Sequence, residues 1–159
     1  MRDLNNKVAW ITGAGSGIGA GAALALAGAG MRLLLSGRRD GLIIKVSSWA
    51  GRHVSALTGP AYSAAKFGVN ALTESLNIEE GRHGIRATAL CPGEVATPIL
   101  DQRPVPVSAE DKARMVQADD CGALVLFLAR LPAHVCINDV TISPTWNRGY
   151  IAQAAAIPP

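Results

Sequence analysis

Tyr62 and Lys66 lie four residues apart in the run AYSAAKFGVNALTESLNIEE, residues 61–80. Apolar residues at helical spacing, such as Leu72 and Leu76, predict a helix here, and a spacing of four places two side chains on one helix face. An ammonium group beside a phenol stabilises the phenolate, so the pair suits proton transfer to or from a substrate oxygen. Ordinary surface Tyr–Lys pairs have the same spacing, so other motifs must support this interpretation.

A glycine-rich segment, TGAGSGIG, runs from Thr12 to Gly19 and follows the apolar run KVAWIT, residues 7–12. Glycine lets the backbone approach a pyrophosphate, and the N-terminus of a following helix, expected over 20–30, offers free N–H groups and a partial positive charge. The run MRLLLSG, residues 31–37, completes a strand, loop, helix, strand unit. A tight turn with close helix packing is the alternative explanation of these glycines.

The rest of the chain continues the alternation of strands and helices. Strands are expected over 42–48, 85–93 and 137–145, and helices over 61–80, 107–116 and 119–131. This alternation predicts an α/β fold with a mainly parallel, doubly wound sheet. Residues 1–150 are expected to form one domain, and residues 151–159 a loose tail.

Composition argues against several classes of protein. The net charge of +3 is too small to indicate nucleic-acid binding, and the Gly- and Ala-rich run 13–31 does not predict a membrane span. Cys91, Cys121 and Cys136 have no paired spacing, which favours reduced thiols and a cytoplasmic location. The three histidines lack metal-ligand spacing, so no metal is expected.

Two further motifs complete a familiar order. Ser47 and Ser48 end the predicted strand before Tyr62, and CPGEVAT, residues 91–97, follows the next strand. With the Gly loop and the Tyr–Lys pair, they make the chain resemble the short-chain dehydrogenase/reductase family over two blocks, 1–40 and 41–148. The resemblance implies a Rossmann-type fold and hydride transfer between NAD(P)(H) and a small carbonyl compound or secondary alcohol.

The resemblance also implies roles for particular residues. Tyr62 would donate or accept the proton, Lys66 would assist it and hold the nicotinamide ribose, and Ser48 would hydrogen-bond the reacting oxygen. Ser47 stays an alternative, because Ser48 lies fourteen residues before Tyr62, one more than the family pattern has. The cofactor would lie against Gly13, Ser16, Gly17, Ile18, Gly19, Lys66, Pro92, Gly93, Val95 and Thr97.

Arg38 and Arg39 bear on the choice of cofactor. NAD-binding proteins generally carry an acidic residue at the end of the second strand, where Gly37 stands here. An arginine makes bidentate contacts with a 2′-phosphate, so NADP is expected rather than NAD. A solvated arginine pair on a turn is the alternative.

The chain departs from the family pattern between the second strand and the Ser47 strand. The family has a long block there, with the Asn-Asn-Ala-Gly strand and the catalytic Asn, but here only residues 37–41 intervene. Five extended residues reach about 18 Å, whereas the family geometry needs roughly 24 Å. Asp40-Gly41 is also typical of a two-residue hairpin, which would carry Ser47 and Ser48 about 20 Å away from the Gly loop.

Three functions therefore remain open. The first is an NADP-dependent oxidoreductase acting on a small-molecule carbonyl or alcohol, which the residues that carry chemistry favour. The second is a catalytically impaired deletion variant that binds nucleotide, which the missing block favours. The third is a protein that only folds and associates, with the Tyr62 helix as a possible contact between identical chains.

Overall fold

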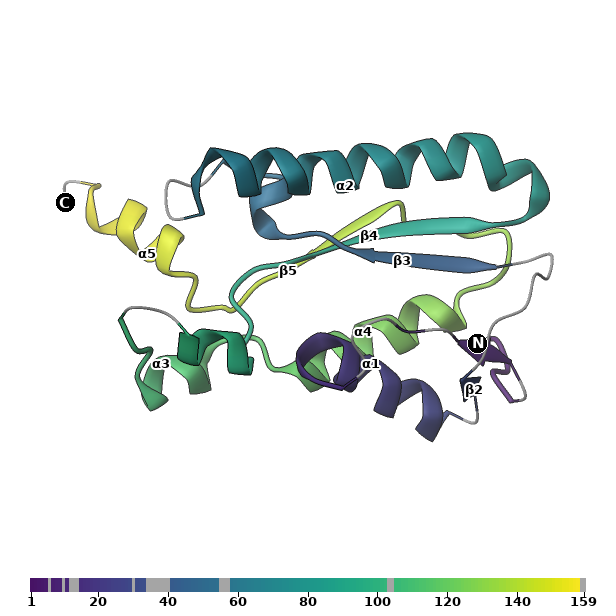
Figure 1. Ribbon diagram of the computed structural model, residues 1–159, viewed down its shortest axis with the longest axis horizontal. Helices are drawn as coiled ribbons and strands as arrows, with labels where there is room; N and C mark the ends of the chain where they lie inside the picture. The colour runs from purple at the N-terminus through teal and green to yellow at the C-terminus, as the bar shows by residue number, and fades with distance from the viewer. Residues whose placement is uncertain are drawn as a thin grey trace.

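The computed structural model describes all residues except 6, 10, 12–14, 30, 34–40, 55–57, 103–104 and 158–159. Strands and helices alternate along the chain (Figure 1), as the sequence predicts. The strands are β1 (Val8–Ala9), β2 (Arg32–Leu33), β3 (Leu42–Val46), β4 (Arg86–Pro92) and β5 (Asp139–Ile142). The α-helices are α1 (Gly17–Gly28), α2 (Gly59–Glu80), α3 (Ala109–Arg114), α4 (Ala118–Arg130) and α5 (Arg148–Ala155). Short 3-10 turns are η1 (Trp49–Gly51), η2 (Gly81–His83) and η3 (Pro98–Gln102).

The described strands form two separate parallel sheets rather than one. Strand β1 pairs with β2, and β3, β4 and β5 form a second sheet in that order. The ladder between β3 and β4 sets Ile44 opposite Thr88. The division falls where the sequence lacks the strand that the family pattern places between the first strand and the Ser47 strand. The expected α/β fold with parallel strands and flanking helices is thus confirmed, and among the described residues its strands form two sheets.

The hairpin alternative is not found in the part of the chain that the structure describes. No ladder joins β2 to β3 there, and Asp40 itself lies outside the described residues. Because β3, β4 and β5 all run in one direction, Ser47 and Ser48 follow the same sheet edge at which β4 and β5 end.

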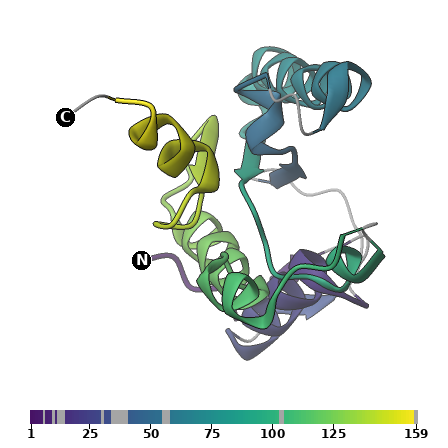
Figure 2. The same ribbon diagram turned by 90° about the vertical axis from the view of Figure 1, so that its left-hand side faces the viewer.

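Helices cover both faces of the three-stranded sheet, with α2 on one side and the α1–α4 pair on the other (Figures 1 and 2). Helices α1 and α4 cross at two glycines. A Cβ on Gly21 would lie 2.2 Å from the carbonyl oxygen of Ala118, and one on Gly122 would lie 2.4 Å from that of Gly21. The small residues of α1 thus allow backbone contact between the two helices.

The core lies between the sheet and the α1–α4 pair, where Leu90 of β4 packs with a cluster of buried side chains: Leu4, Ala22, Leu26 and Val125. Every residue of β4 is buried, since β4 has a neighbour on each side and a helix layer on each face. Strand β3 stands at an edge and is only partly buried, and Val46 is 44% exposed.

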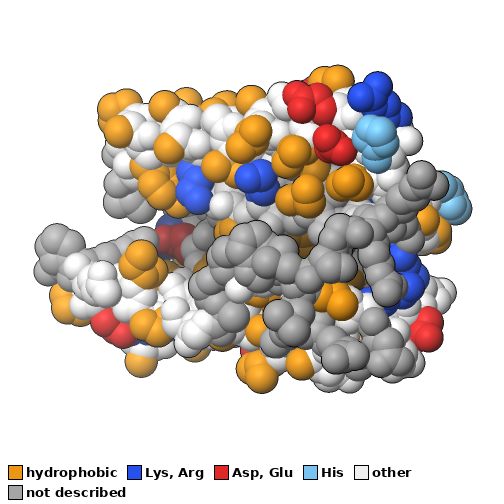
Figure 3. All heavy atoms as spheres, turned by 45° about the vertical axis from the view of Figure 1, so that its right-hand side comes forward, with side chains coloured by type: hydrophobic (Ala, Val, Ile, Leu, Met, Phe, Trp, Pro, Cys, Tyr) orange, Lys and Arg blue, Asp and Glu red, His pale blue; other side chains and the backbone are white. Residues whose placement is uncertain are grey.

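Amide side chains attach α2 to the sheet. Asn77 accepts a hydrogen bond from the N–H of Ala87 at 2.7 Å and donates one to its carbonyl at 2.8 Å, and Asn70 donates to the carbonyl of Gly51 at 2.8 Å. Helix α2 carries exposed apolar side chains, among them Phe67 and Leu72, and hydrophobic side chains gather over this helix (Figure 3).

The C-terminal segment differs from the expected loose tail in one respect, since α5 continues the chain as a helix to Ala155. Among the described residues, none of the helices combines the length and the apolar character that crossing a membrane requires.

Candidate active site

Three segments of the predicted site meet at the edge where β3, β4 and β5 end. They are the turn η1, which begins after Ser48, the segment 93–97, which leaves β4, and the first turn of α1. The first turn of α1 reaches this edge, since Ile18 and Ile142, the last residue of β5, both pack against the buried cluster of Val95, Val116 and Cys121. The first turn of α1 and the two serines therefore lie at the same edge of the sheet.

Gly17 shows why this arrangement needs glycine. Its φ is +54°, a left-handed backbone conformation that residues with a side chain rarely adopt, and a Cβ there would lie 3.2 Å from Cγ2 of Thr97. The structure thus brings Gly17 and Ile18 together with Val95 and Thr97. Ser16 is the N-cap residue of α1 and its side chain makes no capping hydrogen bond, while Gly19 lies in the first turn.

Backbone hydrogen bonds hold the segment after β4 in an extended path. The N–H of Gly93 donates to the carbonyl of Ile142 at 2.7 Å, and the N–H of Ala96 donates to that of Val116 at 2.8 Å. Val95 forms a parallel bridge with Val116. A Cβ on Gly93 would lie 3.1 Å from that of Ser143, so β5 and this segment pack closely.

Lys66 connects the Tyr62 helix with the end of β3. Its Nζ donates to the carbonyl of Val46 at 3.1 Å and lies 5.6 Å from the centre of the Tyr62 ring. Tyr62 is 43% exposed, so this residue lies at the protein surface. A phenol, an ammonium and the strand end before Ser48 are thus brought into one cluster.

The geometry distinguishes the two serines. Ser47 is 3% exposed, and its hydroxyl donates to the carbonyl of Lys66 at 3.0 Å. Ser48 is half-buried and begins η1, with its Oγ accepting a hydrogen bond from the N–H of Ala50 at 3.2 Å. A hydroxyl that accepts in this way still has its own proton to donate.

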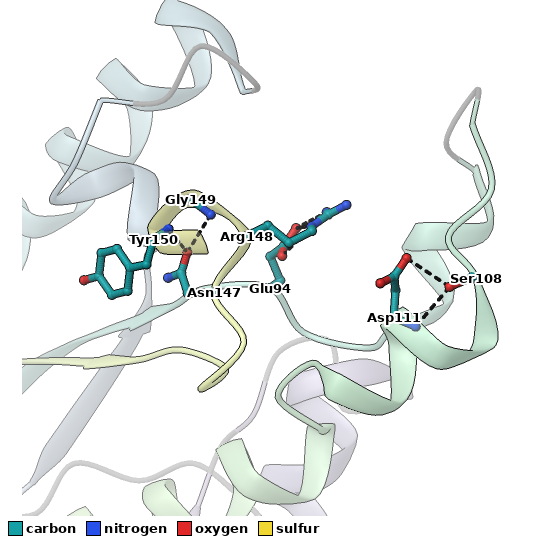
Figure 4. Close-up of polar contacts among 7 residues, drawn as sticks. All are labelled: Glu94, Ser108, Asp111, Asn147, Arg148, Gly149 and Tyr150. Carbon is teal, nitrogen blue, oxygen red and sulfur yellow. Dashed lines mark hydrogen bonds and ion pairs between the residues drawn. The ribbon is translucent and has the colours of Figure 1, made fainter. Parts of the chain in front are cut away.

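The start of α5 adds residues to this region that the sequence reasoning missed (Figure 4). The guanidinium of Arg148 binds the carboxylate of Glu94 in a two-pronged ion pair, with Nε 2.9 Å from Oε2 and 3.1 Å from Oε1. Tyr150 meets the ring of Trp49 edge-on, with ring centres 5.4 Å apart. Asn147, whose Oδ1 accepts from the N–H of Gly149 at 3.0 Å, was an available signal for a helix start.

Three of the residues predicted to bind the cofactor lie where the structure gives no description. Gly13, Arg38 and Arg39 lie outside the described residues. Within the described part of the chain, no cluster of His, Cys, Asp or Glu side chains could hold a metal. A hollow of about 420 Å³ opens beside Thr97, lined by Ala96, Pro98, Asp101, Lys112, Ala113 and Gln117.

The sequence of the chain is similar to those of proteins named as dehydrogenases and reductases. A family profile described as short chain dehydrogenase matches residues 32–105. The human protein named dehydrogenase/reductase SDR family member 11 is 35% identical over 114 residues, which cover 67% of this chain and 44% of that protein. Glycine betaine reductase ATRR of Emericella nidulans is 34% identical over 112 residues, covering 67% of this chain and 9% of that protein. The chain thus spans less than half the length of these relatives.

Solved structures show the same fold. An alcohol dehydrogenase of the archaeon Thermococcus sibiricus, complexed with 5-hydroxy-NADP, superposes with a TM-score of 0.75 at 18% identity, over 89% of this chain and 98% of that one. A β-ketoacyl-[ACP] reductase of Bacteroides thetaiotaomicron gives a TM-score of 0.71 at 22% identity, over 92% and 100% of the two chains. The Rossmann-like fold, the sequence matches and the order of the motifs agree: the chain belongs to the short-chain dehydrogenase/reductase family.

Proposed function

We propose that this chain is an NADP-dependent oxidoreductase that moves a hydride between NADP(H) and a small carbonyl compound or secondary alcohol. The observation that carries the proposal is the position of Lys66, whose Nζ lies 5.6 Å from the centre of the Tyr62 ring and 3.1 Å from the carbonyl oxygen at the end of β3. The first turn of α1 lies at this same edge of the sheet, which supports a shared site for a candidate proton donor and a candidate nucleotide cradle.

The residues at the start of α1 fit a dinucleotide. The first N–H groups of a helix have no partner within it and carry a partial positive charge, which suits phosphate oxygens. Gly17 lies next to Thr97 and has no side chain that would obstruct a bound pyrophosphate. The Ser16 hydroxyl makes no capping hydrogen bond. The bound cofactor would supply the hydride, and the residues around it would supply the proton and the orientation.

Tyr62 is the proposed acid in the direction of reduction. Its hydroxyl donates a proton to the carbonyl oxygen while the carbonyl carbon gains the hydride, which yields an alcohol and a tyrosinate. The Lys66 ammonium stabilises that anion through its nearby positive charge. Because Tyr62 is 43% exposed, water can return the proton directly, without the family's catalytic Asn, which this sequence lacks.

Ser48, rather than Ser47, is the proposed donor to the reacting oxygen. Ser47 is buried, and its hydroxyl is occupied by the carbonyl of Lys66. Ser48 keeps its proton for an external acceptor at the more open position. A hydrogen bond to a developing alkoxide is worth most when the donor is held in place beforehand, as the turn η1 holds this one.

The preference for NADP rests on sequence, because Arg38 and Arg39 lie outside the described residues. Gly37 stands where an acidic residue would bind the ribose hydroxyls of NAD, and an arginine next to it suits a 2′-phosphate. The complex of the archaeal alcohol dehydrogenase with 5-hydroxy-NADP is in keeping with this choice.

The test compares the protein with its Tyr62→Phe variant. NADPH binding is measured by fluorescence titration, and turnover is measured with a panel of small carbonyl compounds as substrates. Both proteins should bind NADPH equally, whereas the variant should lose at least about a hundredfold in turnover, the usual contribution of a positioned acid.

Other results would select a different function. Equal turnover by both proteins would remove Tyr62 from the chemistry. Binding without turnover by either protein would favour the nucleotide-binding module, which the split sheet makes the second candidate. Absence of NADPH binding below the millimolar range would remove the cofactor and with it the proposed reaction.

A further inference from the structure

The segment from Trp146 to Tyr150 contacts parts of the chain that are distant in sequence. The guanidinium of Arg114 lies 4.9 Å from the centre of the Trp146 ring, and Tyr150 meets Trp49, the residue after Ser48. Arg148, between them, binds Glu94 in the segment that follows β4. One short stretch therefore ties α5 to α3 and to two walls of the candidate site.

The pair of Arg148 and Glu94 differs from the ion pairs made by Asp101 and by Glu110. The Glu94 side chain is 24% exposed, whereas the side chains of Asp101 and Glu110 are 66% and 73% exposed in their pairs. Both Nε and a terminal nitrogen of Arg148 bind the carboxylate, a forked geometry that fixes direction as well as distance. Hydrogen bonding to Glu94 also raises the pKa of Arg148 above its usual value.

Backbone hydrogen bonds to Val116 hold Glu94 and Ala96, which lead along the chain to Thr97. Its carbonyl accepts a hydrogen bond from the N–H of Val116 at 3.1 Å, and the N–H of Ala96 donates to the carbonyl of Val116 at 2.8 Å. Thr97 comes next and abuts Gly17 at the start of α1. A displacement of Glu94 therefore shifts the contact between Thr97 and the proposed nucleotide cradle.

We infer that Arg148 is a positioning residue that holds Glu94, and through it the segment 94–97, against the first turn of α1, and so sets the affinity for the dinucleotide. The identity of the ligand rests on the function proposed above. Arg148 acts through Glu94 and the backbone of the segment, so its loss loosens that segment without removing a group that reacts.

The test uses Arg148→Gln, Glu94→Gln and the double variant, with Glu110→Gln as the matched control. The control removes the exposed pair with Arg114 and leaves Arg114 on the Trp146 ring. Amide hydrogen exchange at Ala96 reports how firmly the segment is held, and fluorescence titration reports NADPH affinity. Urea unfolding of each variant shows that it is folded under the conditions of both measurements.

Each single variant should exchange the Ala96 amide about fivefold faster and bind NADPH about fivefold more weakly, the effect of losing one partly buried pair. The double variant should be no worse than either single one, because the two residues act through each other. The Glu110→Gln control should match the unaltered protein.

Unchanged exchange in Arg148→Gln, or effects that multiply in the double variant, would overturn the inference. If the unaltered protein binds no NADPH, the proposed function and the effect on affinity both fail. Exchange at Ala96 still decides, without any ligand, whether Arg148 holds the segment, so the two failures are distinguishable.

Discussion

The crossing of α1 and α4 leads to a quantitative prediction for Gly21→Ala. The new Cβ would lie 2.2 Å from the carbonyl oxygen of Ala118 and 2.7 Å from its carbonyl carbon, whereas ordinary contact begins at 3.4 Å. These are backbone atoms, so no side-chain rotation relieves the overlap. The helices must move apart by about 1 Å, which forfeits a quarter to a half of the attraction at each atom pair that separates.

The expected cost follows from two opposing effects. Overpacking that moves the backbone costs up to about 3 kcal/mol, and alanine regains about 1 kcal/mol over glycine within a helix. The net loss for Gly21→Ala is therefore about 2 kcal/mol. For a chain of this size that corresponds to a fall in Tm of about 4–8 °C.

Urea unfolding and thermal melting measure this loss, and Gly68→Ala is the matched control. Gly68 lies within α2, and a Cβ there would meet nothing within 4 Å, so this variant should gain about 0.5–1 kcal/mol. Gly122→Ala, whose Cβ would lie 2.4 Å from the carbonyl oxygen of Gly21, should lose about as much as Gly21→Ala. If Gly21→Ala proves as stable as Gly68→Ala, the two helices do not touch through their backbones and the reasoning is wrong.

Three further predictions follow from individual side chains. Ser48→Ala should lower turnover about a hundredfold and leave NADPH affinity unchanged. Ser47→Ala should lower the free energy of unfolding by about 1 kcal/mol, because it removes a buried hydrogen bond, and equal losses of turnover in the two variants would contradict the assignment. Asn77→Ala should cost about 2 kcal/mol in urea unfolding, because the buried N–H of Ala87 in β4 loses its acceptor and the carbonyl of Ala87 keeps only the Cys136 thiol; an unchanged midpoint would refute this. At pH 8 a disulfide reagent should modify the exposed Cys136 rapidly and the buried Cys121 slowly. Burial raises the pKa of Cys121 to about 11, so its reactive thiolate forms only as the pH rises toward that value, and rapid modification of both Cys136 and Cys121 would contradict the prediction.

Local patterns in the sequence were sufficient for much of the fold. The apolar run at 42–46 and the helical spacing around Tyr62 predicted β3 and α2, because a strand with helices on both faces and an amphipathic helix leave distinct hydrophobic periods. The family resemblance also implied that the start of α1 and the segment after β4 lie at one edge of the sheet, since parallel strands end at one edge. These predictions rested on local sequence patterns and on the order of the family's motifs along the chain, and they needed no knowledge of contacts between distant residues.

Contacts made by particular side chains could not be predicted. Arg148 and Glu94 are 54 residues apart, and nothing in either local pattern indicates that α5 turns back toward β4. Their contact depends on where β5 ends and on the Asn147 cap that starts the helix. The choice between Ser47 and Ser48 likewise required the burial of each hydroxyl, because the sequence places both at the end of one strand.

The split sheet bears on how such a chain tolerates changes in length. The register of β3 is set by its ladder with β4, which places Ile44 opposite Thr88, while β1 and β2 are ordered by their own ladder. The N-terminal unit is instead anchored by the packing of α1 on α4. Insertions or deletions between β2 and β3 therefore need not shift the register of β3, and evolution can vary that connection while Ser47 and Ser48 keep their place at the end of the strand.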